Sequence, residues 1–467
     1  MNDARRSQAS KARSAARARD DTIVAAATAP GRGAIAVIRV SGADTERIGR
    51  AVLAPWPSRP RALRRCAVHE PGRAGRRIDE ALAVTFAAPG SYTGESMLEV
   101  HSHGGSYIPA AIVAALVSAG ARPAEPGEFT ERAVLNGKLD IVRAEAIGEL
   151  IDARTRAAHR SALSALSGTL TRQYEALRAQ TVELEALLAY EIDFPGEDDG
   201  PVARERIEGA ATTLSARLKE LCDTAPTATL ARDGALVVLA GPPNAGKSSL
   251  LNALVGEARV IVSEEPGTTR DAVEVLLDGD PWPLRVVDTA GLRNDPGTIE
   301  RLGIEVSDRY LGNADIVLVC AENEDGLREA QDRVKRVSGG RIVLVRTKSD
   351  LPSQAGATGQ GAHVAVSART GDGLADLLAR LMREVSEGAG VEAEHSAIVS
   401  SARQRAALTN ARGEVDAFVE AWRARELPAP LAATHLRAAA TALNGLIGVI
   451  DSDDVLERVF STFCVGK

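Results

Sequence analysis

The stretch Gly241-Pro242-Pro243-Asn244-Ala245-Gly246-Lys247-Ser248 decides the fold of the region around it. It follows an apolar run at residues 235–240 that is typical of a buried strand, and a helical pattern begins at Ser248. A glycine-rich turn between a strand and a helix lets backbone N–H groups close around phosphates, and the helix N-terminus adds positive potential. We expect Lys247 to reach the β- and γ-phosphates of a nucleotide and Ser248 to ligate Mg²⁺.

The region from residue 235 to about residue 387 alternates β-branched apolar runs with helical stretches. The expected strands are residues 235–240, 273–277, 284–287, 316–320, 342–345 and 364–366. Strands that alternate with helices indicate a mostly parallel sheet with crossover connections. The sequence therefore predicts an α/β doubly wound P-loop domain rather than a chance glycine-rich turn.

Two further motifs follow in the order that a GTPase requires. Asp288-Thr289-Ala290-Gly291 comes directly after a predicted strand, where Asp288 would hold Mg²⁺ through water and the Gly291 amide would sense the γ-phosphate. Gly267-Thr268-Thr269-Arg270-Asp271 lies between this motif and the cradle, and we expect Thr269 to complete the Mg²⁺ shell.

The base-recognition motif favours guanine. Thr347-Lys348-Ser349-Asp350 follows a predicted strand, and the Asp350 carboxylate can accept both N1–H and N2–H of guanine, which adenine does not offer. Ser367-Ala368-Arg369 would direct backbone N–H groups toward guanine O6. The usual motif begins with Asn, so Thr347 removes one orienting amide, and we predict GTP over ATP with weakened nucleotide binding.

The residue after the Asp-Thr-Ala-Gly motif departs from many small GTPases. Those proteins carry a water-orienting Gln there, whereas this chain has Leu292, which cannot orient water. Asn244 in the cradle offers an uncharged carbonyl oxygen near the phosphates. We therefore expect a cation-assisted arrangement in which Asn244 helps to bind a monovalent ion.

Three regions organise the whole chain, which is predicted to be multidomain. Short apolar runs with Gly and Pro at residues 21–135 predict an α+β N-terminal domain, with strands at 22–28, 34–40, 81–87 and 97–101 and helices at 44–53 and 109–119. Leucines at helical spacing predict an α-helical domain over residues 136–230, resumed over residues 391–467 after the inserted P-loop domain of residues 231–390. Residues 224–233 and 387–396 are the expected hinges of this insertion.

Composition limits the remaining possibilities. Apolar residues make up 45% of the 467 residues, the net charge is −7 and aromatic residues are 3%, which together favour a globular protein without a general nucleic-acid-binding surface. No apolar run is long enough for a transmembrane helix. The four scattered cysteines suit a reducing compartment. Residues 1–20 are basic and predict a disordered extension of a cytoplasmic protein, or a transit peptide of a mitochondrial matrix protein.

Many motifs of the chain resemble the MnmE (TrmE) family of tRNA-modification GTPases. In the P-loop domain they are residues 241–254, Gly-Thr-Thr-Arg-Asp (267–271) and Asp-Thr-Ala-Gly-Leu-Arg (288–293). In the N-terminal region they are residues 21–25, 31–33, 92–95, 103–105, 126–133 and 136–140. The ending Phe-Cys-Val-Gly-Lys (463–467) is the most specific of these motifs, and the resemblance covers all but the first twenty residues.

The resemblance implies a function that composition cannot show. Members of the family, with a flavin-containing (FAD) partner resembling MnmG, modify uridine-34 of tRNA at C5 in the wobble position. Hydrolysis of GTP is K⁺-stimulated and accompanies the meeting of two GTPase domains in a homodimer, which joins the partner in a heterotetramer or larger complex. A tetrahydrofolate, as the 5-formyl or methylene form, binds the N-terminal domain. The expected cofactors are thus GTP, Mg²⁺, K⁺ and a folate, with no membrane partner.

The resemblance also implies individual site residues. Those for GTP are Asn244, Ala245, Gly246, Lys247, Ser248, Ser249, Ser263, Glu264, Glu265, Pro266, Gly267, Thr268, Thr269, Asp288, Thr289, Ala290, Gly291, Thr347, Lys348, Asp350, Ser367, Ala368 and Arg369. The Mg²⁺ ligands are Ser248 and Thr269, and the K⁺ ligands are the Asn244 side chain with backbone carbonyls of Ser263, Glu265 and Thr268. Glu300 resembles the glutamate that orients the attacking water, and an exposed helix-start carboxylate is the alternative.

Residues for the modification chemistry lie at the two ends of the chain. Arg39, Glu95, Lys138 and Lys467 resemble the folate contacts, because an acid suits the pterin and bases suit the glutamate tail. Ordinary surface ion pairs are the alternative. Cys464 resembles a cysteine needed for modification, with a small apolar residue in a docked tail as the alternative. His101 and His103 lack a third metal ligand, and we interpret them as part of a turn.

Two rival functions stay open at this stage. A ribosome-assembly GTPase switch would act without covalent RNA chemistry, but related switches carry an added RNA-binding or second GTPase domain that this sequence does not show. A P-loop metabolic kinase would not need Asp350 or the ordered switch motifs. The terminal Cys464 favours the tRNA-modification hypothesis over both.

Overall fold

The computed structural model describes residues 21–72, 76–193, 203–257, 260–261, 273–288, 309–351, 363–389, 398–424, 428–448, 459–460 and 463–466. They fall into two compact units, one containing the chain up to Gly148 and from Ile447 onward, the other spanning Glu149–Leu446. Each unit has its own sheet or helical core, and each is described by itself.

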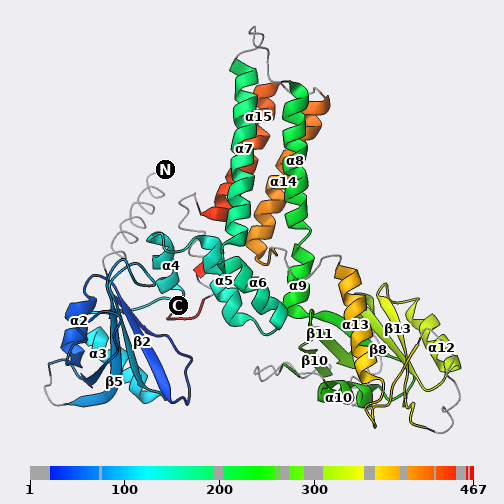
Figure 1. Cartoon of the computed structure of the whole chain (residues 1–467), viewed down its shortest axis with the longest axis horizontal. Helices are drawn as coiled ribbons and strands as arrows, with labels where there is room; N and C mark the ends of the chain where they lie inside the picture. Colours follow the sequence, from blue (N-terminus) through cyan, green and yellow to red (C-terminus); the bar gives the residue numbers. More distant parts are fainter. Residues whose placement is uncertain are drawn as a thin grey trace, which may run out of the picture. The chain divides into compact units, whose positions relative to one another are not determined.

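The first unit is built on a seven-stranded sheet (Figure 1) in the order β3-β4-β5-β6-β2-β1-β7. Its strands are β1 (Ile23–Ala26), β2 (Ile35–Ser41), β3 (Leu53–Ala54), β4 (Arg64–His69), β5 (Arg77–Phe86), β6 (Met97–His103) and β7 (Arg122–Pro123). Helices α2 (Thr45–Val52) and α3 (Tyr107–Ser118) pack on one face, where Ile48 and Ile112 join Val40, Leu98 and Val100 of the strands in a buried core. The predicted α+β class is confirmed.

The C-terminal tail docks on this first unit. Val465 pairs with Pro126 in an isolated bridge, and Gly127 has no room for a side chain because a Cβ there would lie 2.8 Å from the Phe460 carbonyl oxygen. Gly466 has φ +96°, and a Cβ on it would lie 2.4 Å from the carbonyl oxygen of Ala26. The tail is thus held against β1 and the start of α4 (Glu128–Leu135) by close backbone approach.

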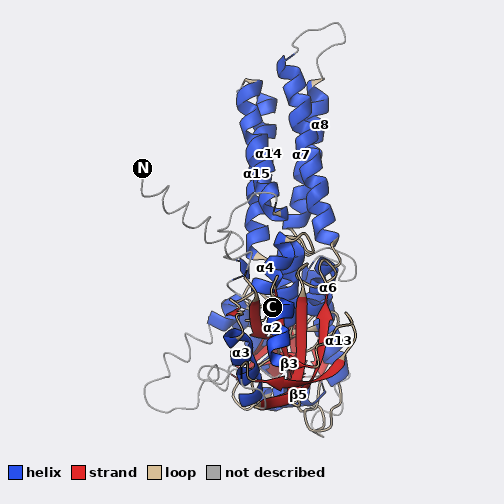
Figure 2. Ribbon diagram, turned by 90° about the vertical axis from the view of Figure 1, so that its left-hand side faces the viewer, coloured by secondary structure: helices blue, strands red, loops and turns tan. Residues whose placement is uncertain are grey.

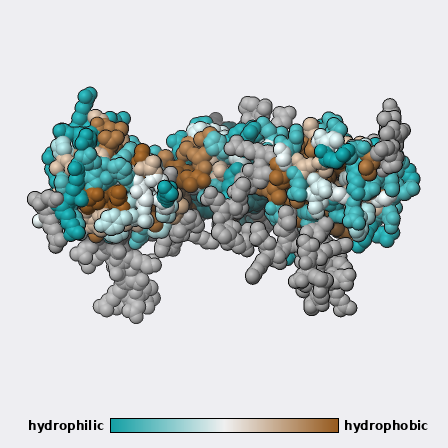
Figure 3. All heavy atoms as spheres, turned by 90° about the horizontal axis from the view of Figure 1, so that it is seen from below, coloured by the Kyte–Doolittle hydropathy of each residue, from teal (hydrophilic) through white to brown (hydrophobic). Residues whose placement is uncertain are grey.

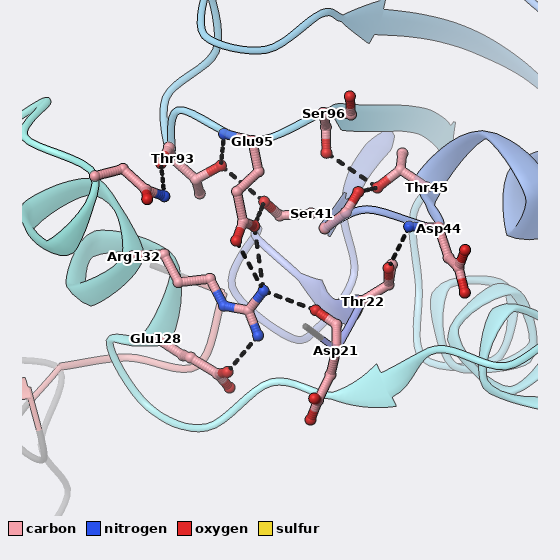
Figure 4. Close-up of polar contacts among 12 residues, drawn as sticks. Asp21, Thr22, Ser41, Asp44, Thr45, Thr93, Glu95, Ser96, Glu128 and Arg132 are labelled. Atoms are coloured by element: carbon pink, nitrogen blue, oxygen red, sulfur yellow. Dashed lines mark hydrogen bonds and ion pairs between the residues drawn. The ribbon is translucent and has the colours of Figure 1, made fainter. Parts of the chain in front are cut away.

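A buried polar network ties the loop before β6 to α4 (Figure 4). The Arg132 guanidinium donates to both carboxylate oxygens of Glu95 at 3.2 and 3.1 Å, to Glu128 at 3.0 Å and to the carbonyl oxygen of Asp21 at 2.8 Å. Ser41 donates to Glu95 at 2.7 Å. Because an unpaired charge is costly in a buried site, these mutual contacts fix the loop, β2 and α4 together.

The second unit contains a bundle of long helices, α7 (Thr169–Asp193), α8 (Arg204–Cys222), α14 (Ala402–Ala424) and α15 (Ala429–Ile447), which lie side by side in Figures 1 and 2. Leucines and alanines spaced three or four residues apart fill its interior. The Tyr174 hydroxyl donates to Gln404 at 2.9 Å across this interior. The shorter helix α6 (Arg156–Leu166) precedes the bundle in this unit, whereas most of α5 (Ile141–Asp152) belongs to the first unit. The predicted helical domain is confirmed as a fold class.

The second sheet has the order β14-β13-β12-β8-β11-β10-β9, parallel from β14 to β11 and antiparallel at β10 and β9. Its strands are β8 (Ala235–Ala240), β9 (Val260–Ile261), β10 (Val273–Leu277), β11 (Leu284–Asp288), β12 (Ile316–Ala321), β13 (Arg341–Arg346) and β14 (His363–Ala365). Val237 and Leu239 face α10 (Lys247–Glu257) and α13 (Leu374–Ala389), whereas Leu236 and Val238 face α12 (Glu324–Val334). Helices on both faces make this the predicted doubly wound fold.

Two local interpretations need correction. Residues 224–233, expected as a hinge, form helix α9 (Ala225–Asp233), because Pro226 at its start is compatible with a first turn and Ala228 and Ala231 are buried. The Thr155 hydroxyl fixes this helix by donating to the Ala231 carbonyl oxygen at 2.6 Å. Strand β4 was not expected, because its pattern begins with two exposed arginines before Cys66 and Val68 enter the core.

The described surface is mostly hydrophilic on the face drawn in Figure 3, with separate hydrophobic patches between the polar side chains. Within the described ranges, each helix is either too short or too polar to serve as a membrane span.

Glu128 offers a test of the polar network. Burial by itself would raise the pKa of its carboxyl, but hydrogen bonds from Arg122, the Glu125 backbone and Arg132 outweigh it and hold the pKa below the ordinary 4.5. Its stabilisation is therefore complete above about pH 4.5 and is lost as the pH falls through the lower folded-state pKa. We expect Glu128→Gln to cost on the order of 3 kcal/mol at neutral pH, measured by urea unfolding followed by circular dichroism.

The difference between Glu128→Gln and the unchanged protein should shrink below pH 4.5. Glu46→Gln is the matched control, because Glu46 pairs with Arg50 on the exposed surface, where ion pairs contribute little. A stability difference that stays constant from neutral pH into the acid range would contradict this account of the network.

Candidate functional site

The cradle at residues 241–248 joins the carboxyl end of β8 to α10. Its turns use positive φ angles of +146° at Gly241, +63° at Asn244 and +79° at Gly246. A Cβ on Gly241 would lie 2.1 Å from the carbonyl oxygen of Cys320 at the end of β12, so only glycine fits there. The cradle is therefore pressed against the neighbouring strand, and the predicted strand–turn–helix context is present.

Lys247 and Ser248 lie where a phosphate and its cation would be held. The buried Lys247 ammonium donates to the carbonyl oxygens of Gly241 and Pro242 at 3.0 and 2.9 Å. The Ser248 hydroxyl donates to Oδ2 of Asp288 at 2.5 Å. Since Mg²⁺ prefers oxygen ligands, this pair from α10 and β11 fits the ion.

The base-recognition residues come together from β13 and β14. Oδ1 of Asp350 accepts from the Ser367 hydroxyl at 2.8 Å, and Oδ2 accepts from Nε of the exposed Arg369 at 2.9 Å. The Ser367 hydrogen bond and then Arg369 hold the pKa of the Asp350 carboxyl below its ordinary value despite desolvation. Asp350 is thus an ionised carboxylate at neutral pH, with two acceptor oxygens that could receive the N1–H and N2–H groups of guanine.

Thr347 and Lys348 connect this base site to the cradle. The Thr347 hydroxyl is 2.8 Å from the carbonyl oxygen of Ala245, and Lys348 pairs through its ammonium with Glu322. The alkyl stem of Lys348 lies along the cradle, 3.9 Å from the position of a Cβ on Gly246. The two motifs are therefore in direct contact, although about 100 residues separate them.

Part of the predicted nucleotide site lies outside the described residues. These positions are Ser263, Glu264, Glu265, Pro266, Gly267, Thr268, Thr269, Thr289, Ala290, Gly291, Leu292 and Glu300. Their assignments to Mg²⁺, K⁺ and the attacking water stay predictions. Asn244 and Ser249 are described and exposed, and Ala368 is half-buried between Ser367 and Arg369.

Three of the predicted folate residues gather around the loop of residues 91–95 in the first unit. Arg39 lies over the Tyr92 ring at 5.5 Å, donates to Glu99 at 2.8 Å and to the Gly466 carbonyl oxygen at 3.4 Å. A Cβ on Gly94 would lie 3.3 Å from Cγ of Lys138, and the Lys138 ammonium donates to the Pro89 carbonyl oxygen at 3.0 Å. Lys467 lies outside the described residues.

A cavity of about 500 Å³ opens beside this loop. Arg61, Phe86, Tyr92, Glu99 and His101 are among its lining residues, so aromatic surface and charged groups meet there. This size is in the usual range for small-ligand sites. The predicted folate residues Arg39, Glu95 and Lys138 are not among the residues that line this cavity.

The remaining singled-out residues have plain structural surroundings. Cys464 is exposed, and its carbonyl oxygen accepts from Gly127 N–H at 3.4 Å in the docked tail. His103 pairs through Nδ1 with Asp79 at 2.7 Å, and the described residues contain no cluster of three metal-ligating side chains. The interpretation of His101 and His103 as part of a turn is wrong, because both residues lie in strand β6 and the turn begins only after His103.

Sequence reasoning missed Arg132, although it quoted the motif that contains it. The signal was available, because Glu128 and Arg132 are four residues apart on one helical face and form an i, i+4 pair. Its contact with Glu95 could not be read from spacing, since 37 residues separate them.

Comparison with known proteins agrees with this geometry. The chain matches the family model described as MnmE helical domain over residues 141–464 and the one described as GTP-binding protein TrmE N-terminus over residues 22–138. It is 42% identical to the tRNA modification GTPase MnmE of Acidiphilium cryptum, covering 96% of this chain and 99% of that protein. The proteins of the same name from Neisseria meningitidis and Methylobacterium radiotolerans are 38% and 40% identical, with 96% of this chain covered in both cases. A nucleotide cradle, a guanine-type base site and a matching N-terminal unit thus occur in one chain, which belongs to the MnmE family of tRNA modification GTPases.

Proposed function

We propose that this protein hydrolyses GTP and, with a flavin-containing partner, takes part in modifying C5 of the wobble uridine of tRNA. The observation that carries the proposal is the assembled nucleotide site in a chain whose similarity to tRNA modification GTPases covers 96% of its length. The cradle supplies phosphate binding, and Asp350 supplies guanine selection. The tail that bears Cys464 is docked on the unit that would hold the folate.

The hydrolytic step needs a replacement for the usual glutamine. Ser248, with Thr269, would hold Mg²⁺, and Asn244 with the carbonyls of Ser263, Glu265 and Thr268 would hold K⁺. These cations, when bound, neutralise charge that develops on the phosphates in the transition state. Glu300 would orient the attacking water, because Leu292 cannot. Dimerisation of the GTPase region would complete this cation-assisted site for GTP hydrolysis.

The folate proposal rests on how the first unit holds its charged groups. Glu95 is oriented by Ser41 and the buried Arg132, so it would present a fixed acceptor to the donor edge of a pterin. Arg39, Lys138 and Lys467 would meet the carboxylates of the glutamate tail. A folate at this site supplies a one-carbon group when bound.

The modification proposal is tested in a strain that lacks the gene. Mass spectrometry of tRNA should show loss of the C5 group on the wobble uridine, restored by the unchanged gene and not by a Lys247→Ala variant. Lys247→Ala removes the cradle's cation and should abolish nucleotide binding. Unaltered C5 modification together with a changed ribosomal particle profile would favour the ribosome-assembly switch instead.

Cation dependence tests the hydrolytic mechanism. Turnover of GTP should be higher in KCl than in NaCl at equal ionic strength, and Asn244→Ala should remove that difference. Glu300→Ala should lower turnover by roughly 10²-fold, the usual contribution of a positioned proton acceptor, without weakening GTP binding. Equal rates in the two salts, or full turnover of Glu300→Ala in KCl, would exclude the assigned roles.

Folate binding is measured directly on the full chain by calorimetric titration with 5-formyltetrahydrofolate. Glu95→Gln should weaken binding by roughly tenfold to a hundredfold, the range for a lost charge-assisted hydrogen bond. Glu46→Gln, an exposed glutamate in the same unit, is the control and should bind as before. Equal affinities of Glu95→Gln and the unchanged protein would remove Glu95 from the site.

A further inference from the structure

Thr347 occupies the first position of the base-recognition motif, where an asparagine is usual. Its side chain is 3% exposed, and it lies at the carboxyl end of β13 between β12 and the cradle. Its backbone N–H donates to the Ala321 carbonyl oxygen at 2.9 Å. The residue is therefore fixed on both its backbone and its side chain before any nucleotide binds.

The Thr347 hydroxyl has one hydrogen to donate, and two carbonyl oxygens lie within its reach. The Ala245 oxygen is at 2.8 Å and the Ala321 oxygen at 3.3 Å. Both neighbours are acceptors, so the single hydrogen is committed to the protein backbone. An asparagine amide carries two hydrogens and can serve the cradle and a base together, whereas this hydroxyl cannot.

The contact with Ala245 also sets the direction of the next backbone amide. In a trans peptide the C=O and N–H of one unit point in opposite directions. Holding the Ala245 carbonyl toward Thr347 therefore turns the Gly246 N–H away from Thr347 and into the cradle. Gly246, with φ +79°, permits this turn at no steric cost.

We propose that Thr347 is a positioning residue that holds the cradle in shape and donates no hydrogen bond to N7 of the purine. Guanine recognition then depends on Asp350, and the protein does not distinguish a purine N7 from a C–H at that position. This inference rests on the proposed role of Asp350 as the reader of guanine.

The test compares GDP with 7-deaza-GDP, in which N7 is replaced by C–H, by calorimetric titration of the full chain. Diphosphates are used because they are not hydrolysed during the titration. We expect the two dissociation constants to agree within about twofold, less than the effect of one ordinary neutral hydrogen bond. A preference for GDP of about fivefold or more would overturn the proposal, because it requires a donor to N7.

Two variants separate the cradle contact from base recognition. Thr347→Val keeps the shape and loses the hydroxyl, and we expect it to weaken both nucleotides equally, by roughly threefold to tenfold. Thr347→Asn should create a preference for GDP over 7-deaza-GDP, also of roughly threefold to tenfold. A Thr347→Val variant that weakens GDP and leaves 7-deaza-GDP unchanged would overturn the proposal.

Thr434→Val and Thr434→Asn are the matched controls. The Thr434 hydroxyl also donates to a backbone carbonyl, that of Leu431 at 2.6 Å, but it is exposed on α15 in the helical bundle. Thermal unfolding midpoints of all variants show whether a change in affinity follows from loss of folding. If Thr347→Asn does not fold, the unchanged protein and Thr347→Val still decide the question.

A separate arm tests the role of Asp350 on which the inference rests. ADP should bind far more weakly than GDP, because adenine lacks the N1–H and N2–H donors. Equal binding of ADP and GDP would reject Asp350 as the guanine reader, whatever 7-deaza-GDP shows. A strong preference for GDP over ADP with a fivefold preference over 7-deaza-GDP would reject the Thr347 inference alone.

Discussion

Parallel pairing of β8 with β11 and β12 is the constraint on which the nucleotide site depends. It brings the carboxyl ends of these strands to one edge of the sheet. Gly241 directly follows β8 there, Asp288 ends β11 and Ala321 ends β12. The close approach of Gly241 to Cys320 then leaves no freedom in where the cradle begins. Ser248 meets Asp288, and Thr347 meets Ala245, because that edge holds their strands and loops in register. The chemistry of the site is thus a consequence of strand order.

Local motifs made the nucleotide region predictable from the sequence. The cradle, the doubly wound class and the positions of Lys247, Ser248 and Asp350 depend on residues close together in the chain or on strands with strong apolar runs. Contacts across long separations were not predictable, such as Arg132 with Glu95 or Val465 with Pro126. Weak patterns also failed: α9 begins near a proline, and its buried face is made of small residues that give little periodic signal.

Both candidate sites use a residue from elsewhere in the chain to immobilise a loop. In the first unit, buried Arg132 holds Glu95, and in the second, buried Thr347 holds Ala245. In each case the group that would face the ligand is a neighbour of the holding residue, and the holding residue has its polar atoms already engaged. A site arranged in this way does not need to reorganise these groups when the ligand enters, which lowers the cost of binding.

The two loops nevertheless differ in whether the contact that holds them is charged or neutral. Arg132 holds Glu95 through opposite charges in a buried site, so removing Arg132 leaves the Glu95 carboxylate without its cationic partner, whereas Arg132 also pairs with Glu128. Thr347 holds the cradle through a neutral hydroxyl, which shapes the phosphate site and leaves its electrostatic field to Lys247 and to the helix N-terminus of α10. A neutral contact of this kind is modest in strength. The nucleotide site therefore gains its geometry from strand order and its charge from Lys247, with selectivity for the base assigned to one carboxylate.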